Sequence, residues 1–280
     1  MIFNTSTLGY KLYSGTLKKH SEQLNKFVAG LFDADGHVSF DFCRNKIQIQ
    51  SAISVCDSKL IKALRDHYNL GTVVNMEVKE VTHNQCFRWV MRTKDSKKFF
   101  NLIGKHLRIK GTHFNNLCNI HTELQEEVLE DSLIVELKNI SKESRKNSTW
   151  IRYPKHPSYS WVAGYLAGDG HFEFRTSVRA NGNRSLTMRV SSICHEDDKH
   201  ILYFLQKAFR GSVKKINSKP HYVWKKTVGK GYHLFALPFL KKLRLYMCLE
   251  KKYIVIDSMV KYHEQLAETK CCETSNEVVR

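Results

Sequence analysis

Two aspartates, Asp35 and Asp169, are the residues of this chain best placed to do chemistry together, because each ends the same short pattern. The segments read VAGLFDAD and VAGYLAGD, and a glycine and a histidine follow each. Two carboxylates that are held close together repel each other unless a cation joins them. Mg²⁺ prefers oxygen ligands and is usually bound through few carboxylates together with phosphates and water. We therefore expect a divalent-metal site at the two aspartates.

The residues before the aspartates predict how two helices bring them together. Gly30 and Ala34 lie four positions apart, as do Gly164 and Gly168, so each helix carries a stripe of small residues. Such stripes let helix backbones approach closely, and a glycine after the aspartate is typical of a helix C-terminus. The alternative is that each aspartate is a helix cap or turn residue. The repetition of the same arrangement favours the metal site.

The two patterns belong to a longer internal repeat, which predicts the domain organisation. Residues 27–40 and 161–174 match at an offset of 134, and two further matching segments follow each of them in the same order. A repeat of this length indicates two copies of one folding unit. The expected division is an extension over 1–24, units over 25–121 and 160–266, a connector over 122–159 and a tail over 267–280.

Within each unit the hydrophobic period alternates between those of helix and strand. Val38, Phe40 and Phe42 alternate with polar residues in the first copy, as Phe172, Phe174 and Val178 do in the second. Asn181-Gly182-Asn183 is typical of a hairpin turn. The order helix, hairpin, helix, hairpin, helix predicts an α+β fold of two αββαββα units with antiparallel sheets. We expect one face of each sheet to meet helices and the other to be polar and basic.

The net charge of +18 predicts a polyanionic partner. From His200 to Leu249 there are eleven Lys or Arg and no acidic residue, whereas a merely solvated surface normally mixes both signs. Nucleic acid is the expected ligand of such a basic globular chain. Acidic residues cluster instead between Glu123 and Glu136, so we expect the connector to lie on the side of the molecule away from a phosphate backbone.

Composition excludes several other classes. No apolar run is long enough to cross a bilayer, and the N-terminus carries no signal-peptide pattern, so secretion is not expected. The eight cysteines show no CxxC spacing, which argues against a zinc site and a disulfide framework. We expect reduced and mostly buried thiols.

The nonapeptides VAGLFDADG over 28–36 and VAGYLAGDG over 162–170 resemble the signature of the LAGLIDADG homing endonucleases, in the single-chain form that carries two motifs. The resemblance covers the chain between Leu24 and Leu266. It implies that the two pseudo-twofold-related sheets form a DNA-binding saddle, and that Asp35 and Asp169 are catalytic metal ligands. Ala34 and Gly168, which precede them, complete the implied metal site. Ala167 replaces the counterpart of Asp33, which agrees with a structural role for that earlier acid in the family.

The family also carries a lysine near each active site, at the start of the last helix of each unit. Lys110 takes this place in the first copy, and Lys252 matches its apolar spacing better than the neighbouring Lys251 does. Such a lysine stabilises charge on the reacting phosphate or orients the attacking water; the alternative is an ordinary phosphate contact.

Three further residues are expected beside the site. Glu196 falls where the family often has a Gln or Glu near bound water, and Val55 or Cys56 takes that place in the first copy. His37 and His171 follow the Asp-Gly pairs, and we expect them to contact DNA or support the metal ligands. A zinc interpretation of the two histidines lacks Cys or His partners at ligand spacing.

The resemblance implies metal-dependent hydrolysis of both strands of a long, asymmetric double-stranded DNA site. Mg²⁺ would be the cofactor, cleavage would cross the minor groove and leave short 3′ overhangs, and the sheets would read the flanking major grooves. The strand-face residues expected to contact DNA are Ser39, Gln48, Gln50, Arg88, Arg92, Glu173, Arg175, Ser177, Arg179, Arg189 and Lys225.

Two other functions use the same fold. An intron maturase would bind intron RNA and need the basic surface but not the aspartates, so their retention favours cleavage. A DNA-binding regulator would be expected to lack one aspartate and carry a helix-turn-helix, and neither feature is present. Because both half-sites lie in one chain, we expect a monomer without a membrane partner. An intron-encoded enzyme of this type is expected in an organelle, with bacterial or archaeal cytoplasm as the alternative.

Overall fold

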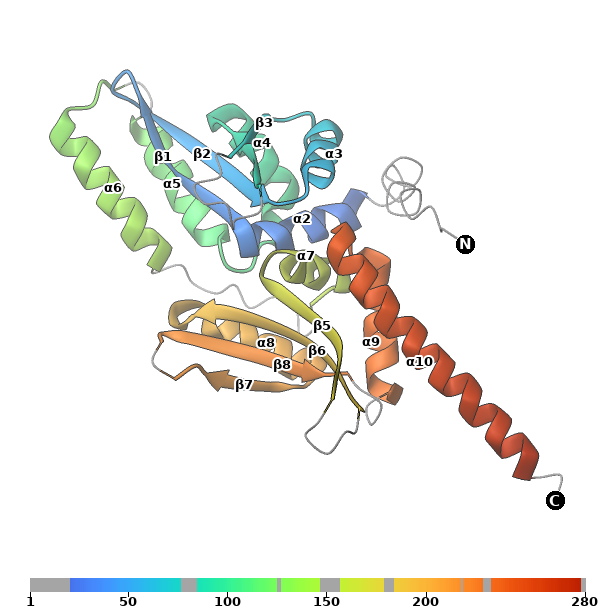
Figure 1. The fold of residues 1–280 in the computed structure, drawn as a ribbon. Helices are drawn as coiled ribbons and strands as arrows, with labels where there is room; N and C mark the ends of the chain where they lie inside the picture. Colours follow the sequence, from blue (N-terminus) through green and yellow to red (C-terminus); the bar gives the residue numbers. More distant parts are fainter. Residues whose placement is uncertain are drawn as a thin grey trace. The chain divides into compact units, whose positions relative to one another are not determined.

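The computed structural model describes residues 21–76, 85–124, 127–146, 157–178, 184–217, 219–228 and 233–277. The chain divides into two compact units, Met1–Gly168 and Asp169–Arg280. Each contains a four-stranded antiparallel sheet of its own (Figure 1). Among the described residues, no helix is sufficiently long and apolar to span a bilayer.

The first unit follows the predicted order of helix, hairpin, helix, hairpin and helix. Its elements are α2 (Ser21–Asp35), β1 (Gly36–Cys43), β2 (Lys46–Val55), α3 (Ser58–Tyr68), β3 (Thr72–Asn75), β4 (Phe87–Met91), α4 (Thr93–Ile103), the short 3₁₀ helix η1 (Gly104–His106), α5 (Gly111–Leu124), α6 (Asp131–Lys146) and α7 (Tyr159–Asp169) up to Gly168. The additional helix α4 was not predicted: it is amphipathic and buries Ser96, Phe99 and Ile103.

The strands of this unit are arranged β1-β2-β4-β3, and helices contact one face of the sheet (Figure 1). Alternation along the strands sets which side chains are buried. Val38 and Phe40 are buried, as predicted, whereas Phe42 is only half-buried; Ile47 and Ile49 of β2 are buried too. Trp89 of β4 packs edge-to-face on Phe99 of α4, which joins the sheet to its helical layer.

The second unit repeats this sheet with the order β5-β6-β8-β7. Its elements are β5 (Gly170–Val178), β6 (Arg184–His195), η2 (Glu196–Asp198), α8 (Lys199–Phe209), β7 (Ser212–Lys215), β8 (His221–Thr227), α9 (His233–Tyr246) and α10 (Glu250–Glu277). β5 and β6 pair from Gly170 with Ser192 to Val178 with Arg184. The predicted turn residues Asn181, Gly182 and Asn183 lie outside the described residues.

Several burial predictions are wrong. Phe174 and Val178 are 37% and 70% exposed, because the hairpin of β5 and β6 extends to where β8 no longer pairs with β6. Among the described cysteines only Cys194 is buried, although mostly buried thiols were expected. Part of the expected tail is helical, because α10 continues to Glu277.

Candidate functional site

Asp35 and Asp169 are each the last residue of a helix and directly precede the first strand of a sheet. Asp35 ends α2 and is exposed, and Asp169 ends α7 and is half-buried. The C-terminus of a helix carries a partial negative charge, so a carboxylate there adds to an unfavourable potential. A nearby positive charge compensates this potential, and a metal ion bound by the two aspartates stays a prediction.

The small residues of α2 and α7 pack these helices backbone to backbone within the first unit. A Cβ atom added to Gly30 would overlap the backbone oxygen of Trp161, and one added to Gly164 would overlap that of Phe27. At Gly168 an added Cβ would lie 2.7 Å from Asp35 Oδ2. The predicted close packing of the two motif helices is therefore present, and a side chain at Gly168 would require Ala34 and Asp35 to shift.

Asp33 is buried and organises the backbone that leads into α5. Its carboxylate accepts hydrogen bonds from the backbone N–H groups of Arg108, Ile109 and Lys110, at 2.8, 3.1 and 3.0 Å. The indole N–H of Trp161 on α7 donates a fourth, at 3.1 Å. Burial raises the pKa of Asp33. Both oxygens are engaged in the protein interior, so the side chain serves the fold and is not directed at a metal.

Lys110 lies at the C-terminus of α2, immediately before α5, as predicted. Its Nζ donates hydrogen bonds to the carbonyl oxygens of Phe32, Ala34 and Gly36, at 2.9, 3.0 and 2.6 Å. An ammonium group offers three donors, and here they meet the carbonyls that a helix end leaves without intrahelical partners. In this arrangement the charge stabilises the backbone on both sides of Asp35, including the carbonyl of Ala34.

The corresponding residues of the second unit lie at the start of α10 and in η2. Lys252 is half-buried in the first turn of α10, whereas Lys251 is exposed. Glu196 lies in η2 and forms long ion pairs with Lys199 and Lys215, at 3.7 and 3.6 Å. Its carboxylate is thus engaged by surface lysines.

Strand register corrects the first-copy equivalent of Glu196. Gly36 pairs with Ile53, and Gly170 pairs with Ser192. Counting on from these positions aligns Glu196 with Asp57, not with Val55 or Cys56. Asp57 caps α3, because its side chain accepts from the N–H groups of Lys59 and Leu60.

His37 and His171 are exposed at the second position of their strands. Desolvation lowers the pKa of His37, and the positive charges of Arg145, Lys110 and Arg88 lower it further. The imidazole is therefore neutral at physiological pH and surrounded by cations. A site for a polyanion needs such an excess of positive charge.

Arg145 is a residue that the sequence interpretation missed, because the acidic connector was expected on the opposite side of the molecule. The last turn of α6 is held on α5 and β1 by a chain of hydrogen bonds. Ser144 Oγ contacts His113 Nδ1 at 3.1 Å, and His113 Nε2 contacts the carbonyl oxygen of Val38 at 3.3 Å. Val38 is the neighbour of His37, so α6 brings its basic end to the Asp35 region. The available signal was Arg145-Lys146 at the end of an otherwise acidic helix.

Protonation of His113 is expected to destabilise the protein in mild acid. Burial, with smaller effects of Arg145, His37 and Lys110, lowers the pKa of His113 to about 4. The unfolded chain takes up this proton near pH 6.5, so stability is retained above that pH and is lost as the pH falls toward 4. Thermal unfolding between pH 7 and 4.5 should therefore show a smaller fall in Tm for His113→Gln than for wild type. His171→Gln is the control, because the His171 imidazole is exposed in the native state as well as in the unfolded chain. Equal falls in Tm for wild type and His113→Gln would contradict the expectation.

Predicted DNA contacts of the first sheet share one face. Ser39 pairs with Gln50 across β1 and β2, and Gln48 pairs with Asp41. Arg88 of β4 donates from Nε to Ser54 Oγ at 3.2 Å. Arg92 is exposed but follows the last residue of β4 and precedes α4. The face presents amides, a hydroxyl and a guanidinium, which are the groups that read base edges and phosphates.

In the second sheet, Glu173 holds two guanidinium groups side by side. Arg189 lies opposite Glu173 and donates to it, with an Nε···Oε2 distance of 2.8 Å, and Arg175 Nε contacts Oε1 at 2.7 Å. The hydrogen bond from Arg189 is the main reason that the pKa of Glu173 is lowered. Lys225 is exposed on β8. The backbone of Ser177 belongs to β5, but its side chain and all of Arg179 lie outside the described residues.

The basic stretch from His200 to Leu249 is not uniformly a surface. Lys226 is buried: its Nζ donates to the carbonyl oxygen of Phe209 at 2.6 Å and lies 5.2 Å from the ring centre of Phe239. Burial lowers its pKa. Lys214, Lys215 and Lys219 are exposed, as expected of a phosphate-binding surface.

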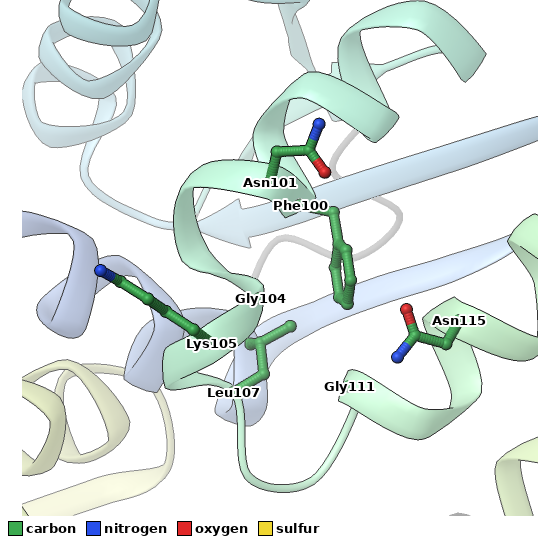
Figure 2. A pocket seen from close by; sticks show the side chains of 7 residues that line it. All are labelled: Phe100, Asn101, Gly104, Lys105, Leu107, Gly111 and Asn115. Atoms are coloured by element: carbon green, nitrogen blue, oxygen red, sulfur yellow. The ribbon is translucent and has the colours of Figure 1, made fainter.

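A pocket of about 540 Å³ in the first unit contains none of the predicted site residues. It lies between α4, η1 and α5, and Figure 2 shows Phe100 and Asn115 beside it. The Phe100 ring stacks on Phe114 with centroids 4.0 Å apart.

No group of three or more His, Cys, Asp or Glu within the described ranges is arranged to hold a metal ion.

Comparison with solved structures gives close matches in fold, whereas no protein-family model and no curated protein matches the sequence. The crystal structure of the LAGLIDADG homing endonuclease I-GzeII in complex with its DNA target matches with a TM-score of 0.65 at 16% identity, over 88% of this chain and 91% of that chain. I-SmaMI bound to cleaved DNA matches with a TM-score of 0.64, also at 16% identity, over 88% and 90%. The LAGLIDADG meganuclease I-AabMI bound to uncleaved DNA gives 0.62 at 14% identity, over 88% and 92%. The fold implied by the two nonapeptides is thereby confirmed.

Proposed function

We propose that this chain is a homing-type endonuclease that cuts both strands of a long, asymmetric DNA site by metal-dependent phosphodiester hydrolysis. The observation that carries the proposal is Asp35, exposed at the end of α2, where α2 packs backbone to backbone against a second helix that ends in Asp169. The fold shared with DNA-bound homing endonucleases supports it. The net charge of +18 supports a polyanionic substrate.

The residues around Asp35 fit a hard divalent cation such as Mg²⁺. The carboxylate is exposed and lies at the negative end of a helix, and the lack of a side chain on Gly168 lets α7 come close to it. When bound, the metal would supply a hydroxide nucleophile and neutralise charge on the phosphodiester. One matching structure, that of I-SmaMI on uncleaved DNA, was obtained in the presence of calcium ions.

The chain's own residues would then divide the remaining work. Asp35 and Asp169 would hold the cation, and Lys110 would stabilise the backbone that carries Asp35. His37, neutral and exposed, can exchange protons with water or contact a phosphate oxygen. The faces of the two sheets would bind the DNA on either side of the cut, with Arg88, Arg175 and Arg189 oriented in advance by Ser54 or Glu173.

The direct test is selection of cleaved duplexes from a random DNA library with the purified chain. With Mg²⁺ we expect a single long consensus, cut on both strands with short 3′ ends, and with EDTA we expect no cleavage. Sedimentation of the free protein should show a monomer. Failure to cleave any duplex, with intron RNA bound tightly in the same buffer, would support the maturase alternative instead.

Arg145 is expected to contribute a phosphate contact next to the cleavage site. Arg145→Gln should weaken DNA binding for all sequences alike and reduce the slope of log Kd against log salt by about one. Lys146→Gln is the matched control, because it removes one charge from the adjacent residue, whose Nζ lies 3.0 Å from Glu143. Fluorescence anisotropy at several salt concentrations measures both. An equal loss in the two variants would indicate only a general charge effect.

A further inference from the structure

Cys56 and Cys86 face each other at the ends of two paired strands in the first unit. Cys56 follows the last residue of β2, and Cys86 precedes the first residue of β4. The antiparallel register that pairs Val55 with Phe87 continues to them. Their Sγ atoms are 2.9 Å apart, and Cys56 is exposed while Cys86 is half-buried. Disulfides have an S–S distance of about 2.05 Å, so the two sulfur atoms lie only slightly farther apart than in a disulfide.

The second unit shows independently that side chains at this register position meet. Ile53 pairs with Trp89, and Ser192 pairs with Trp224. Counting three residues forward on the first strand and three back on its partner leads to Cys56 and Cys86 in one sheet. The same count leads to His195 and His221 in the other sheet. The two imidazole rings are in contact, with centroids 5.6 Å apart. The facing of Cys56 and Cys86 thus follows from the backbone geometry that both sheets share.

The other described cysteines are poorer candidates for oxidation as a pair. Burial raises the pKa of Cys118, and it raises that of Cys194 to about 12. A thiol reacts as its thiolate, so both are less reactive than an exposed cysteine. Cys43 is exposed, but only Cys56 and Cys86 lie at a thiol–thiol distance within the described ranges.

We propose that Cys56 and Cys86 are a redox-modification site, oxidised to an intramolecular disulfide by a low-molecular-weight disulfide such as oxidised glutathione. The exposed Cys56 thiolate attacks one glutathione sulfur, forms a mixed disulfide and releases the first glutathione thiolate. The Cys86 thiolate then attacks Cys56 Sγ and releases the second. The two protons lost by the cysteines go to the two glutathione thiolates, and the two electrons reduce the glutathione disulfide. This inference does not depend on the proposed DNA cleavage.

The disulfide would close the chain segment 57–85, which includes α3 and β3. It would also fix the end of the β2–β4 pair next to the hydrogen bond between Arg88 and Ser54. A cross-link over a segment of this length restricts the unfolded chain. We expect the oxidised protein to unfold at a Tm higher by roughly 5–10 °C.

The test uses the full chain, reduced and then equilibrated with graded ratios of oxidised to reduced glutathione. Remaining thiols are alkylated, and the digest is analysed by mass spectrometry alongside a thermal unfolding curve. The expected result is a peptide pair cross-linked through Cys56 and Cys86, together with the rise in Tm. Cys56→Ser and Cys86→Ser should each abolish both, and Cys43→Ser should change neither. Stable glutathione adducts on Cys56 without the cross-link, or cross-links to other cysteines, would overturn the proposal.

Discussion

Replacing Asp35 by asparagine is expected to reduce DNA cleavage by orders of magnitude while DNA binding survives. Asparagine keeps the size of the side chain and one oxygen, but it removes the negative charge that a divalent cation requires. The hydroxide nucleophile would be lost with the metal. Binding should not weaken, because a carboxylate near phosphates is repulsive without a cation. The same behaviour is expected of Asp169→Asn.

Cleavage and gel-shift assays run in parallel on one DNA duplex measure the two effects, with Ca²⁺ in the binding buffer to prevent turnover. The matched control is Asp33→Asn, which makes the same chemical change two residues away. Because Asp33 accepts four N–H hydrogen bonds in the interior, its loss should lower the free energy of unfolding by about 1–3 kcal/mol. The folded fraction should retain much of its activity. Full cleavage by Asp35→Asn would remove it from the metal site.

Much of the fold was predictable because local patterns and the internal repeat agree. One of the matching segments of the repeat begins at Asp57, and its side chain caps α3. The stripes of small residues in α2 and α7 likewise predicted the close packing that is present around Gly30 and Gly164. These features could be predicted because the residues that determine each of them lie within a few positions of one another in the sequence.

Other features depend on contacts between distant segments and left no clear local signal. The turn between β1 and β2 consists of Arg44 and Asn45, both with positive φ, without the glycine that usually marks such a turn. Helix α9 continues through Pro238, which by itself would predict a break. Lys226 was counted as a surface charge, but strand alternation on β8 places it in the interior, where its Nζ donates a hydrogen bond to the Phe209 carbonyl oxygen.

The candidate site was predictable in part for the same reasons. Asp35, Asp169 and Lys110 were candidates because each occupies a defined position at a helix end, and their roles stay predictions. Arg145 was missed because its place depends on contacts from Ser144 to His113 and from His113 to Val38, which span 31 and 75 residues of chain. Average charge along a segment does not reveal which end of a helix reaches a site.

The close packing of α2 and α7 makes Gly164→Ala and Gly30→Ala the substitutions with the largest expected cost in stability. In both cases the added methyl group would overlap backbone atoms: Phe27 O and Leu31 N for Gly164, and Trp161 O and Tyr165 N for Gly30. Backbone in a helix cannot rotate away as a side chain can, so the two helices must separate. Their separation would also strain the hydrogen bond between the Trp161 indole and Asp33.

Overpacking of a core commonly costs about 1–3 kcal/mol, and we expect at least about 3 kcal/mol here because the clash is with backbone. This exceeds the gain of up to about 1 kcal/mol that alanine normally brings over glycine within a helix. Gly104→Ala is the matched control, since the three atoms nearest to the added Cβ all belong to the Phe100 ring, at 2.9–3.1 Å. Chemical denaturation of the three variants gives the free energies of unfolding. If Gly164→Ala were as stable as Gly104→Ala, α2 and α7 would not be in backbone contact. The proposal that α7 supports Asp35 would then fail as well.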